Sequence, residues 1–276
     1  MIKKINILLY LILFFSCQSE NTLPKAKEQM EKGNYPLALT YLNKLLKNDS
    51  LNKELICLRG ICFFSLEKYK EASIDFSNCL SEELNDTSIL LKRAEAYEKL
   101  GIIQLAIEDY NKILKYSPNN LSALNSRGLL YSSINELDLA LSDYLAYLHI
   151  DSNQYIVHSN IGIIYAKKEL YQKAVSEYSK AIQFDKSDSR IYFNRGISYM
   201  YLEKYKYALD DFDKAILLYP EESVYYLNRG NAYDALNLKE NACSDWYKAN
   251  EMGNSNAEIL IKENCLNDKN SSKNIS

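Results

Sequence analysis

The 276-residue sequence has few of the residues from which catalytic and metal sites are built. It holds two histidines, His149 and His158, and neither has neighbours spaced as metal ligands. Its 8 glycines form no phosphate-binding loop. Serines near glycine, such as Ser126 and Ser198, lack the strand–turn–helix setting of a nucleophile. The sequence therefore predicts no enzyme, no metal site and no cofactor.

The sequence also lacks a surplus of basic residues. Its 33 lysines and arginines are outnumbered by 36 aspartates and glutamates, for a formal net charge of −3. Proteins that bind nucleic acid carry clustered positive charge, because the phosphate backbone supplies most of the affinity. We therefore expect no nucleic-acid partner.

A long hydrophobic run is missing as well, although the start of the chain resembles an export signal. Lys3 and Lys4 precede an apolar run at residues 7–15, which is too short to cross a bilayer. The run leads into FFSC at residues 14–17, which resembles the lipobox of bacterial lipoproteins, although leucine is commoner three residues before the cysteine. The resemblance implies cleavage before Cys17 and acylation of that cysteine. The alternative is an ordinary secretory signal with an incidental cysteine.

Either interpretation places the protein outside the cytoplasm. Gln18, rather than aspartate, follows the cysteine, which is similar to outer-membrane sorting in such lipoproteins. We therefore expect residues 1–16 to be a signal peptide and residues 17–18 a lipidated N-terminus. The expected location is the bacterial cell envelope, as an outer-membrane lipoprotein that faces the periplasm or the cell surface.

From residue 19 the chain repeats one 34-residue unit seven times, at 19–52, 53–86, 87–120, 121–154, 155–188, 189–222 and 223–256. Position 20 is always alanine: Ala38, Ala72, Ala106, Ala140, Ala174, Ala208 and Ala242. Position 8 is always small: Ala26, Gly60, Ala94, Gly128, Gly162, Gly196 and Gly230. From the second copy on, position 11 is aromatic (Phe63, Tyr97, Tyr131, Tyr165, Tyr199, Tyr233), and so is position 24 (Phe76, Tyr110, Tyr144, Tyr178, Phe212, Trp246).

Each unit contains two segments of helical length, at positions 1–14 and 15–30, with apolar residues three and four apart. Small residues at positions 8 and 20 let the two helices approach closely, and the aromatic residues fill the space beside the crossing. Position 15 often holds a residue that tolerates the left-handed end of a helix: Gly33, Gly101, Asn135 and Asn237. Because one helical pair cannot bury its apolar faces alone, neighbouring pairs must stack.

In these residues the chain resembles tetratricopeptide repeat proteins. The resemblance implies an all-α fold, an α-solenoid in which seven helical hairpins form a right-handed superhelix with the first helices on the concave side. Residues 257–266 are expected to form a C-terminal capping helix over the last exposed face. The polar residues 267–276 are expected to form a disordered tail.

Two positions of the unit carry matched charges. Position 7 is arginine and position 23 aspartate in five copies: Arg59 with Asp75, Arg93 with Asp109, Arg127 with Asp143, Arg195 with Asp211 and Arg229 with Asp245. The other two copies change at both positions, to Lys25 with Tyr41 and to Ile161 with Glu177. Because both changes occur in the same copy, we expect structural ion pairs within each repeat and not between repeats.

Five cysteines remain besides Cys17, and a location outside the cytoplasm favours disulfides. Cys243 and Cys265 fall at about the same height on neighbouring antiparallel helices, so we expect a disulfide that holds the capping helix. Cys62 and Cys79 differ in height by roughly 13 Å, which excludes a bond between them. We interpret Cys57, Cys62 and Cys79 as small core residues.

One stripe of each first helix, positions 2, 5, 6, 9, 12 and 13, faces the groove in the family that the chain resembles. The stripe is charged in the third copy but apolar and aromatic in the fifth and sixth, and asparagine occupies position 6 in copies five to seven. That asparagine row resembles a ladder that holds a peptide backbone, since each amide can both donate and accept. The predicted partner-binding residues are Asn160, Phe193, Asn194, Met200, Tyr201, Asn228 and Asn231.

The alternative for the apolar side chains of this stripe is packing between adjacent first helices, which we favour for Ile163 and Ile197 but not for Phe193 and Tyr201.

The predicted function is a non-enzymatic, lipid-anchored scaffold that binds a protein or peptide in its groove. A second hypothesis is a structural subunit of an envelope secretion, motility or outer-membrane assembly complex, bound through the convex face. An enzyme or a carbohydrate-binding receptor is the weaker third.

Overall fold

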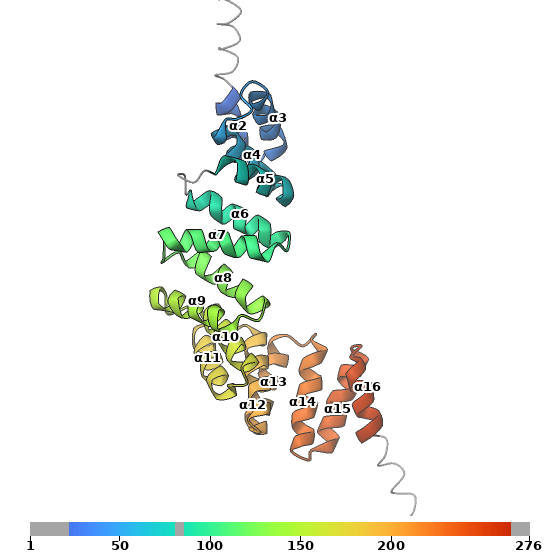
Figure 1. The fold of residues 1–276 in the computed structure, drawn as a ribbon. Helices are drawn as coiled ribbons and strands as arrows, with labels where there is room; N and C mark the ends of the chain where they lie inside the picture. The colour runs from blue at the N-terminus through green and yellow to red at the C-terminus, as the bar shows by residue number, and fades with distance from the viewer. Residues whose placement is uncertain (1–21, 81–85, 266–276) are drawn as a thin grey trace, which may run out of the picture. The chain divides into compact units, whose positions relative to one another are not determined.

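The computed structural model describes residues 22–80 and 86–265, and all of its regular structure is helical. The predicted signal peptide, Cys17 and the predicted tail lie outside the described residues. The chain divides into two compact units, residues 1–130 and residues 131–276 (Figure 1).

The first unit contains the early hairpins. Its helices are α2 (Thr22–Glu31), α3 (Tyr35–Leu46), α4 (Lys53–Ser65), α5 (Tyr69–Cys79), α6 (Thr87–Lys99) and α7 (Ile103–Tyr116), followed by α8 (Leu121–Ser133), in which the unit ends. Each helix from α2 to α6 packs on the next along the chain, and the first helices α4 and α6 also touch each other.

The second unit continues the same arrangement. Its helices are α9 (Leu137–Ile150), α10 (Tyr155–Lys167), α11 (Tyr171–Phe184), α12 (Ser189–Tyr201), α13 (Tyr205–Leu218), α14 (Ser223–Ala235), α15 (Lys239–Glu251) and α16 (Ser255–Asn264). Successive helices pack together, and the first helices α10, α12 and α14 form a layer of their own, since α12 contacts both of the others. The predicted all-α fold of stacked hairpins is confirmed, while the superhelical hand stays a prediction.

The repeated small and aromatic residues form the core. All seven alanines at position 20 have no exposed surface, and the aromatic side chain at position 24 is fully buried in every copy from the second on. A Cβ atom added to Gly162, Gly196 or Gly230 would come within 2.7 Å of the aromatic ring at position 24 of the same copy. Position 8 is therefore small because the aromatic ring occupies the space that a side chain would fill.

The hairpin turn occupies positions 14–16 of the unit. Gly33, Gly101, Asn135 and Asn237 have positive φ at position 15, as their residue types predict. Glutamates occupy the same left-handed conformation in three other copies, Glu67, Glu169 and Glu203, at φ of 56–59°. The repeat geometry thus imposes a conformation that disfavours these glutamates.

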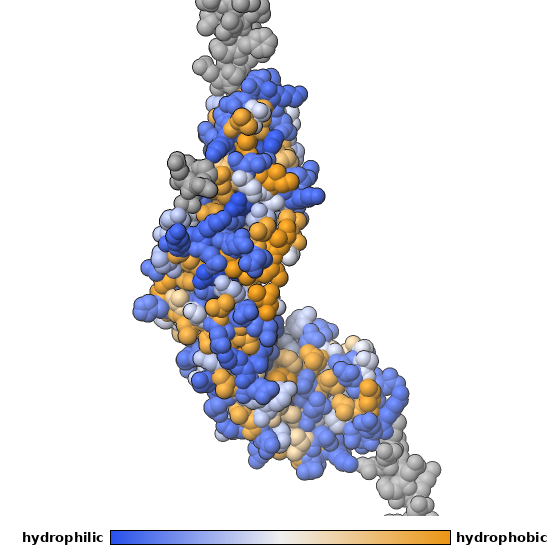
Figure 2. All heavy atoms as spheres, in the orientation of Figure 1, coloured by the Kyte–Doolittle hydropathy of each residue, from blue (hydrophilic) through white to orange (hydrophobic). Residues whose placement is uncertain are grey.

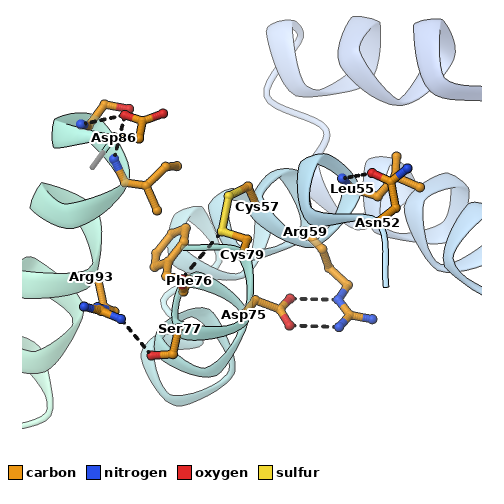
Figure 3. Close-up of a disulfide and its surroundings, with 12 residues drawn as sticks. Asn52, Leu55, Cys57, Arg59, Asp75, Phe76, Ser77, Cys79, Asp86 and Arg93 are labelled. Carbon is orange, nitrogen blue, oxygen red and sulfur yellow. Dashed lines mark hydrogen bonds and ion pairs between the residues drawn. A yellow bond between two sulfur atoms is a disulfide. The ribbon is translucent and has the colours of Figure 1, made fainter. Parts of the chain in front are cut away.

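In several copies the side chain at position 34 caps the first helix of the following copy. Asn52 accepts a hydrogen bond from the backbone N–H of Leu55, and Asp86 accepts from Ser88 and Ile89 (Figure 3). Asn120 does the same for Ala123. These side chains satisfy N–H groups that a helix start leaves without a partner.

Candidate partner-binding surface

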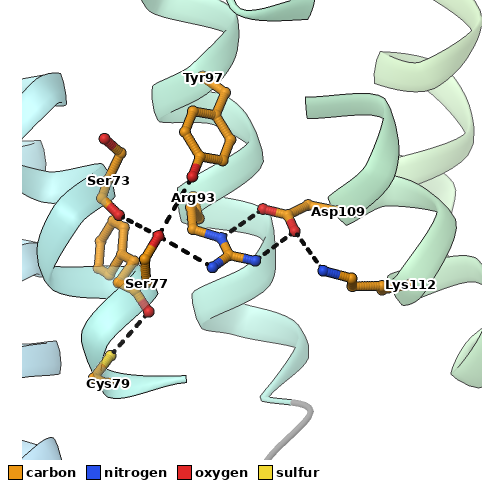
Figure 4. A network of polar contacts seen from close by, with 8 residues as sticks. Ser73, Ser77, Cys79, Arg93, Tyr97, Asp109 and Lys112 are labelled. Atoms are coloured by element: carbon orange, nitrogen blue, oxygen red, sulfur yellow. Dashed lines mark hydrogen bonds and ion pairs between the residues drawn. The ribbon is translucent and has the colours of Figure 1, made fainter. Parts of the chain in front are cut away.

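Four of the five predicted Arg–Asp pairs are bidentate contacts inside single hairpins, while the pair Arg127–Asp143 stays a prediction. Nε and Nη2 of Arg93 donate to the two carboxylate oxygens of Asp109 over 2.7 and 2.6 Å (Figure 4). The same two nitrogens join Arg59 to Asp75, Arg195 to Asp211 and Arg229 to Asp245 over 2.7–2.8 Å. The four aspartates are buried. Hydrogen bonding to Asp75 raises the pKa of the Arg59 guanidinium against the opposing effect of burial.

The predicted pairing within a repeat is confirmed for these four pairs, and the third guanidinium nitrogen adds a contact to the preceding repeat that the sequence did not predict. Nη1 donates to position 25 of the preceding copy: from Arg59 to Asn43, from Arg93 to Ser77, from Arg127 to Asn111, from Arg195 to Ser179 and from Arg229 to Asp213. Each arginine therefore connects two consecutive hairpins. A signal in the sequence matches this contact, because position 25 is the apolar Leu145 only where the next copy has Ile161 in place of arginine.

In the fifth copy, which lacks the arginine and the aspartate, His158 and Glu177 form the polar contact between the two helices. Nδ1 of His158 lies 2.7 Å from Oε2 of Glu177, and its Nε2 lies 3.2 Å from the carbonyl oxygen of Ser152. Lys180 donates to the other oxygen of Glu177 over 2.7 Å. His158 is buried and its ring stacks on Phe184. His158 is thus a buried polar side chain that joins α10 to α11 through Glu177.

Tyr201 is the most exposed aromatic residue of the predicted binding stripe. It ends α12 with 64% of its surface exposed, and its ring stacks on that of Tyr171 at 4.4 Å between centroids and an angle of 2°. Ile156, near the start of α10, is also exposed. The stacking holds the ring of Tyr201 in place, so that its free face can contact another molecule without further loss of rotamer freedom.

The asparagines of the stripe differ in what their side chains do. Asn228 donates to the carbonyl oxygen of Val224 one turn earlier, over 2.8 Å. Asn231 accepts a hydrogen bond from Nε1 of Trp246 over 3.0 Å. Among the described residues, the half-buried amide of Asn194 forms no hydrogen bond. Asn231 is therefore a structural acceptor for a buried indole. The amide of Asn194, in contrast, has its donors and acceptor available to a ligand. Asn160 is half-buried on α10.

Two of the predicted binding residues are used for packing between hairpins. The ring of Phe193 lies 4.9 Å from that of Tyr225 on α14 and 5.8 Å from that of Phe212 on α13. Met200 is half-buried against the same core cluster. The preference for Phe193 as a ligand contact is therefore corrected, since its ring fills the space between adjacent copies. Ile163 and Ile197 are likewise half-buried in core clusters.

The residues that the structure describes contain two disulfides. Cys243 and Cys265 are bonded, which joins α15 to the end of α16. Cys57 on α4 and Cys79 on α5 are bonded as well, with Cα atoms 5.4 Å apart (Figure 3). This second bond corrects the interpretation of both residues as plain core side chains. Cys62 is a free, fully buried thiol, and burial raises its pKa to about 11.

A cavity of about 380 Å³ opens beside the Cys57–Cys79 bond. Its lining comes from α4, α5 and the start of α6: Lys53, Glu54, Cys57, Leu58, Ile61, Cys79, Asp86, Ser88 and Ile89. Several of these residues belong to the groove stripe of copies two and three. Sequence reasoning had placed the binding surface in copies five to seven and missed this cavity.

Neither a metal-binding cluster nor a membrane-spanning helix is found among the described residues. No group of three or more histidine, cysteine, aspartate or glutamate side chains is arranged to hold a metal ion in them. Each of their helices is too short or too polar to cross a membrane. Polar and apolar side chains are interspersed over the visible surface of both units (Figure 2).

Comparison with known proteins gives one consistent result. Family models described as tetratricopeptide repeat match residues 23–76, 91–155, 157–188 and 189–222, which together make up more than half of the chain. No curated protein matches the sequence.

Solved structures agree with the family models. A tetratricopeptide repeat protein from Parabacteroides merdae is 26% identical, with a TM-score of 0.63 over 89% of this chain and 96% of that one. The C-terminal part of a repeat protein from Cytophaga hutchinsonii is 19% identical, with a TM-score of 0.70 over 86% and 98%. YrrB, described as a tetratricopeptide repeat protein with an unusual peptide-binding site, is 17% identical, with a TM-score of 0.60 over 68% and 97%. The chain belongs to the tetratricopeptide repeat family.

Proposed function

We propose that this protein is a non-enzymatic scaffold that binds an extended segment of a partner protein along α10, α12 and α14. The observation that carries the proposal is the exposed ring of Tyr201, fixed by its stack on Tyr171. Rigid aromatic side chains supply contact area at a low entropic cost, and they are frequent energetic centres of protein interfaces.

The neighbouring amide supports an extended ligand. Asn194 precedes Tyr201 by two helical turns on α12, and its side chain has donors and an acceptor to offer to a peptide backbone. The exposed Ile156 on α10 adds an apolar contact on the adjoining first helix. The similar structure of YrrB is described as having a peptide-binding site, and we extend that property to this chain as part of the proposal.

We further propose that a lipid on Cys17 attaches the scaffold to a bacterial membrane. The support comes from the residues before the fold: two lysines, a short apolar run and the FFSC sequence that ends in Cys17. A scaffold held in this way would concentrate its partners at the membrane surface, because the bound partners could not diffuse away from it.

A second candidate is a subunit of an envelope assembly that is contacted through the second helices. Tyr207 on α13 is 60% exposed, and Leu139 and Leu145 on α9 are exposed as well. Exposed apolar side chains of this kind are suited to a protein interface. Tyr207 therefore serves as a matched control for Tyr201, because both tyrosines belong to the sixth copy and have similar exposure.

The experiment is affinity capture from the membrane fraction of the native cells, using the full chain with Tyr201→Ala, Asn194→Ala or Tyr207→Ala. The proposal expects the unaltered chain and the Tyr207 variant to capture the same partner. The Tyr201 and Asn194 variants should bind this partner at least about tenfold more weakly, a change of 1.4 kcal/mol in binding free energy. Loss with the Tyr207 variant alone would instead support binding through the second helices. Thermal unfolding of each variant controls for misfolding.

A further inference from the structure

The disulfide between Cys57 and Cys79 forms part of the wall of a cavity. Both cysteines line the 380 Å³ space, together with the apolar side chains of Leu58, Ile61 and Ile89. Pockets that hold small molecules have volumes of about 300–1,000 Å³. A disulfide that only holds two helices together does not require an open cavity beside it. The cavity therefore indicates a function in addition to this crosslink.

The two sulfur atoms differ in their surroundings. Cys79 is 1% exposed, whereas Cys57 is half-buried and more open. Sγ of Cys79 lies 3.6 Å from the carbonyl oxygen of Phe76, which would accept a hydrogen bond from a Cys79 thiol once the disulfide is open (Figure 3). The protein therefore leaves the sulfur of Cys57 open to attack, while the carbonyl oxygen of Phe76 can accept a hydrogen bond from Cys79 only after that sulfur has been protonated.

The charges around the cavity favour an attacking thiolate. Glu54 at the rim is paired with Lys27 over 2.8 Å, and the Asp86 carboxylate accepts from the N–H groups that start α6. Lys53 lines the cavity and forms no ion pair among the described residues. A lysine in the wall of the cavity offers a positive charge to a thiolate that enters it, and the thiolate is the nucleophile in exchange.

We propose that this cavity is a site of thiol–disulfide exchange, in which a low-molecular-weight thiol becomes attached to Cys57. The thiolate sulfur attacks Sγ of Cys57 and forms a new S–S bond. The bond to Cys79 breaks, its electron pair leaves with Sγ of Cys79, and that thiolate takes a proton from water. One disulfide replaces another, so this step needs no outside oxidant or reductant.

The test uses the oxidised full chain and a single probe, cysteamine, at graded concentrations near pH 8, where an ordinary thiol is partly ionised. After an acid quench and alkylation, peptide mass spectrometry assigns each cysteine. The proposal expects cysteamine on Cys57 and an alkylated Cys79 at concentrations that leave Cys243–Cys265 intact. A first adduct on Cys79, Cys243 or Cys265, or no adduct before the chain unfolds, would overturn it.

Two variants test whether the cavity is the route of access. Ile61→Trp fills it and should slow attachment at least about tenfold, because a thiol must reach the sulfur to react. Lys53→Gln keeps the shape and should also slow attachment. Attachment at the unaltered rate in a folded Ile61 variant would show that the bond is reached by local unfolding, and would sink the proposal. Circular dichroism establishes whether each variant is folded. If the Ile61 variant is unfolded, the Lys53 variant is the test: slower attachment supports the proposal, and an unaltered rate contradicts it.

Discussion

At the scale of single residues, one guanidinium contributes to two kinds of contact. Arg195 closes its own hairpin through Asp211 and reaches the preceding one through Ser179. The first contact is bidentate and involves a buried carboxylate, whereas the second is a single hydrogen bond to a hydroxyl group. Charge-assisted pairs of fixed geometry are the stronger of the two, so the hairpin should depend on Asp211 more than the junction depends on Ser179.

Asp211→Ala should lower the free energy of unfolding by about 1–3 kcal/mol, because it leaves the largely buried charge of Arg195 without its main partner. Ser179→Ala is the matched control and should cost about 1 kcal/mol or less. Urea unfolding of the two single variants, and of each combined with Arg195→Ala, measures the coupling energies. A stronger coupling of Arg195 to Ser179 than to Asp211 would contradict this assignment.

The glycine at position 8 gives a second prediction at this scale. A Cβ atom on Gly162 would lie 2.6 Å from the ring of Tyr178, which is fully buried. Gly162→Ala should therefore destabilise the protein by about 1–3 kcal/mol through overpacking. Adding Tyr178→Leu, which removes the ring, should recover part of that loss. Calorimetry showing an unchanged melting temperature for the single variant would rule out the steric account.

At the scale of the helical hairpin, the turn is set by the repeat and not by the residue that occupies it. Glu203 has φ of 56° at the position where Gly101 has φ of 71°. A side chain in this conformation costs about 1–2 kcal/mol relative to the right-handed one, and glycine avoids that cost. Local residue preference alone could not have placed the left-handed turn in the copies with glutamate; the register of the repeat does.

Glu203→Gly should accordingly raise the stability of the sixth copy by up to about 1 kcal/mol, because the gain in backbone geometry exceeds the entropy that glycine adds to the unfolded chain. Gly101→Ala is the reciprocal control and should destabilise the third copy. Thermal unfolding measures both. If the Glu203 variant loses stability, the side chain must contribute a contact that outweighs the backbone strain.

The capping helix is the last helix of the described part of the chain. α16 packs on α15, and the Cys243–Cys265 bond closes a loop of 22 residues around it. A crosslink over a loop of that length contributes about 3 kcal/mol in the chain-entropy model. Replacing both cysteines by serine should therefore speed amide hydrogen exchange in α15 and α16 and leave α12 unchanged, since repeats couple mainly to their neighbours. Equal acceleration in α12 would show that the cap stabilises the whole unit.

The repeat register predicted the hairpins and the Arg–Asp pairs, but it predicted the side chains between hairpins less well. The bond between Cys57 and Cys79 was not predicted, because only the height of Cys62 was compared with that of Cys79; the Cα atoms of the bonded pair lie 5.4 Å apart. Phe193 was assigned to the groove because position 5 borders both the groove and the next first helix. Only the packing on Tyr225 decides between them.

At the scale of the whole molecule, attachment to the membrane depends in this account on one residue outside the described fold. Cys17→Ala should move the protein from the membrane fraction to the soluble one without unfolding the repeats, because each acyl CH₂ contributes about 0.8 kcal/mol of membrane affinity. Fractionation after a salt wash measures this. Lys27→Ala, which removes a surface charge near the start of the fold, is the control. Membrane association of the Cys17 variant after the wash would contradict the lipid anchor.

The central claim is that a partner segment lies along the first helices of the second unit, at Tyr201. Site-specific photo-crosslinking tests it most directly, with benzoylphenylalanine introduced at residue 201 or at residue 207 of the full chain in its native cells. The account predicts that residue 201 crosslinks to a partner polypeptide and that residue 207, equally exposed on the second helix of the same copy, does not. Crosslinks from residue 207 alone, or to the same partner from both positions, would contradict it.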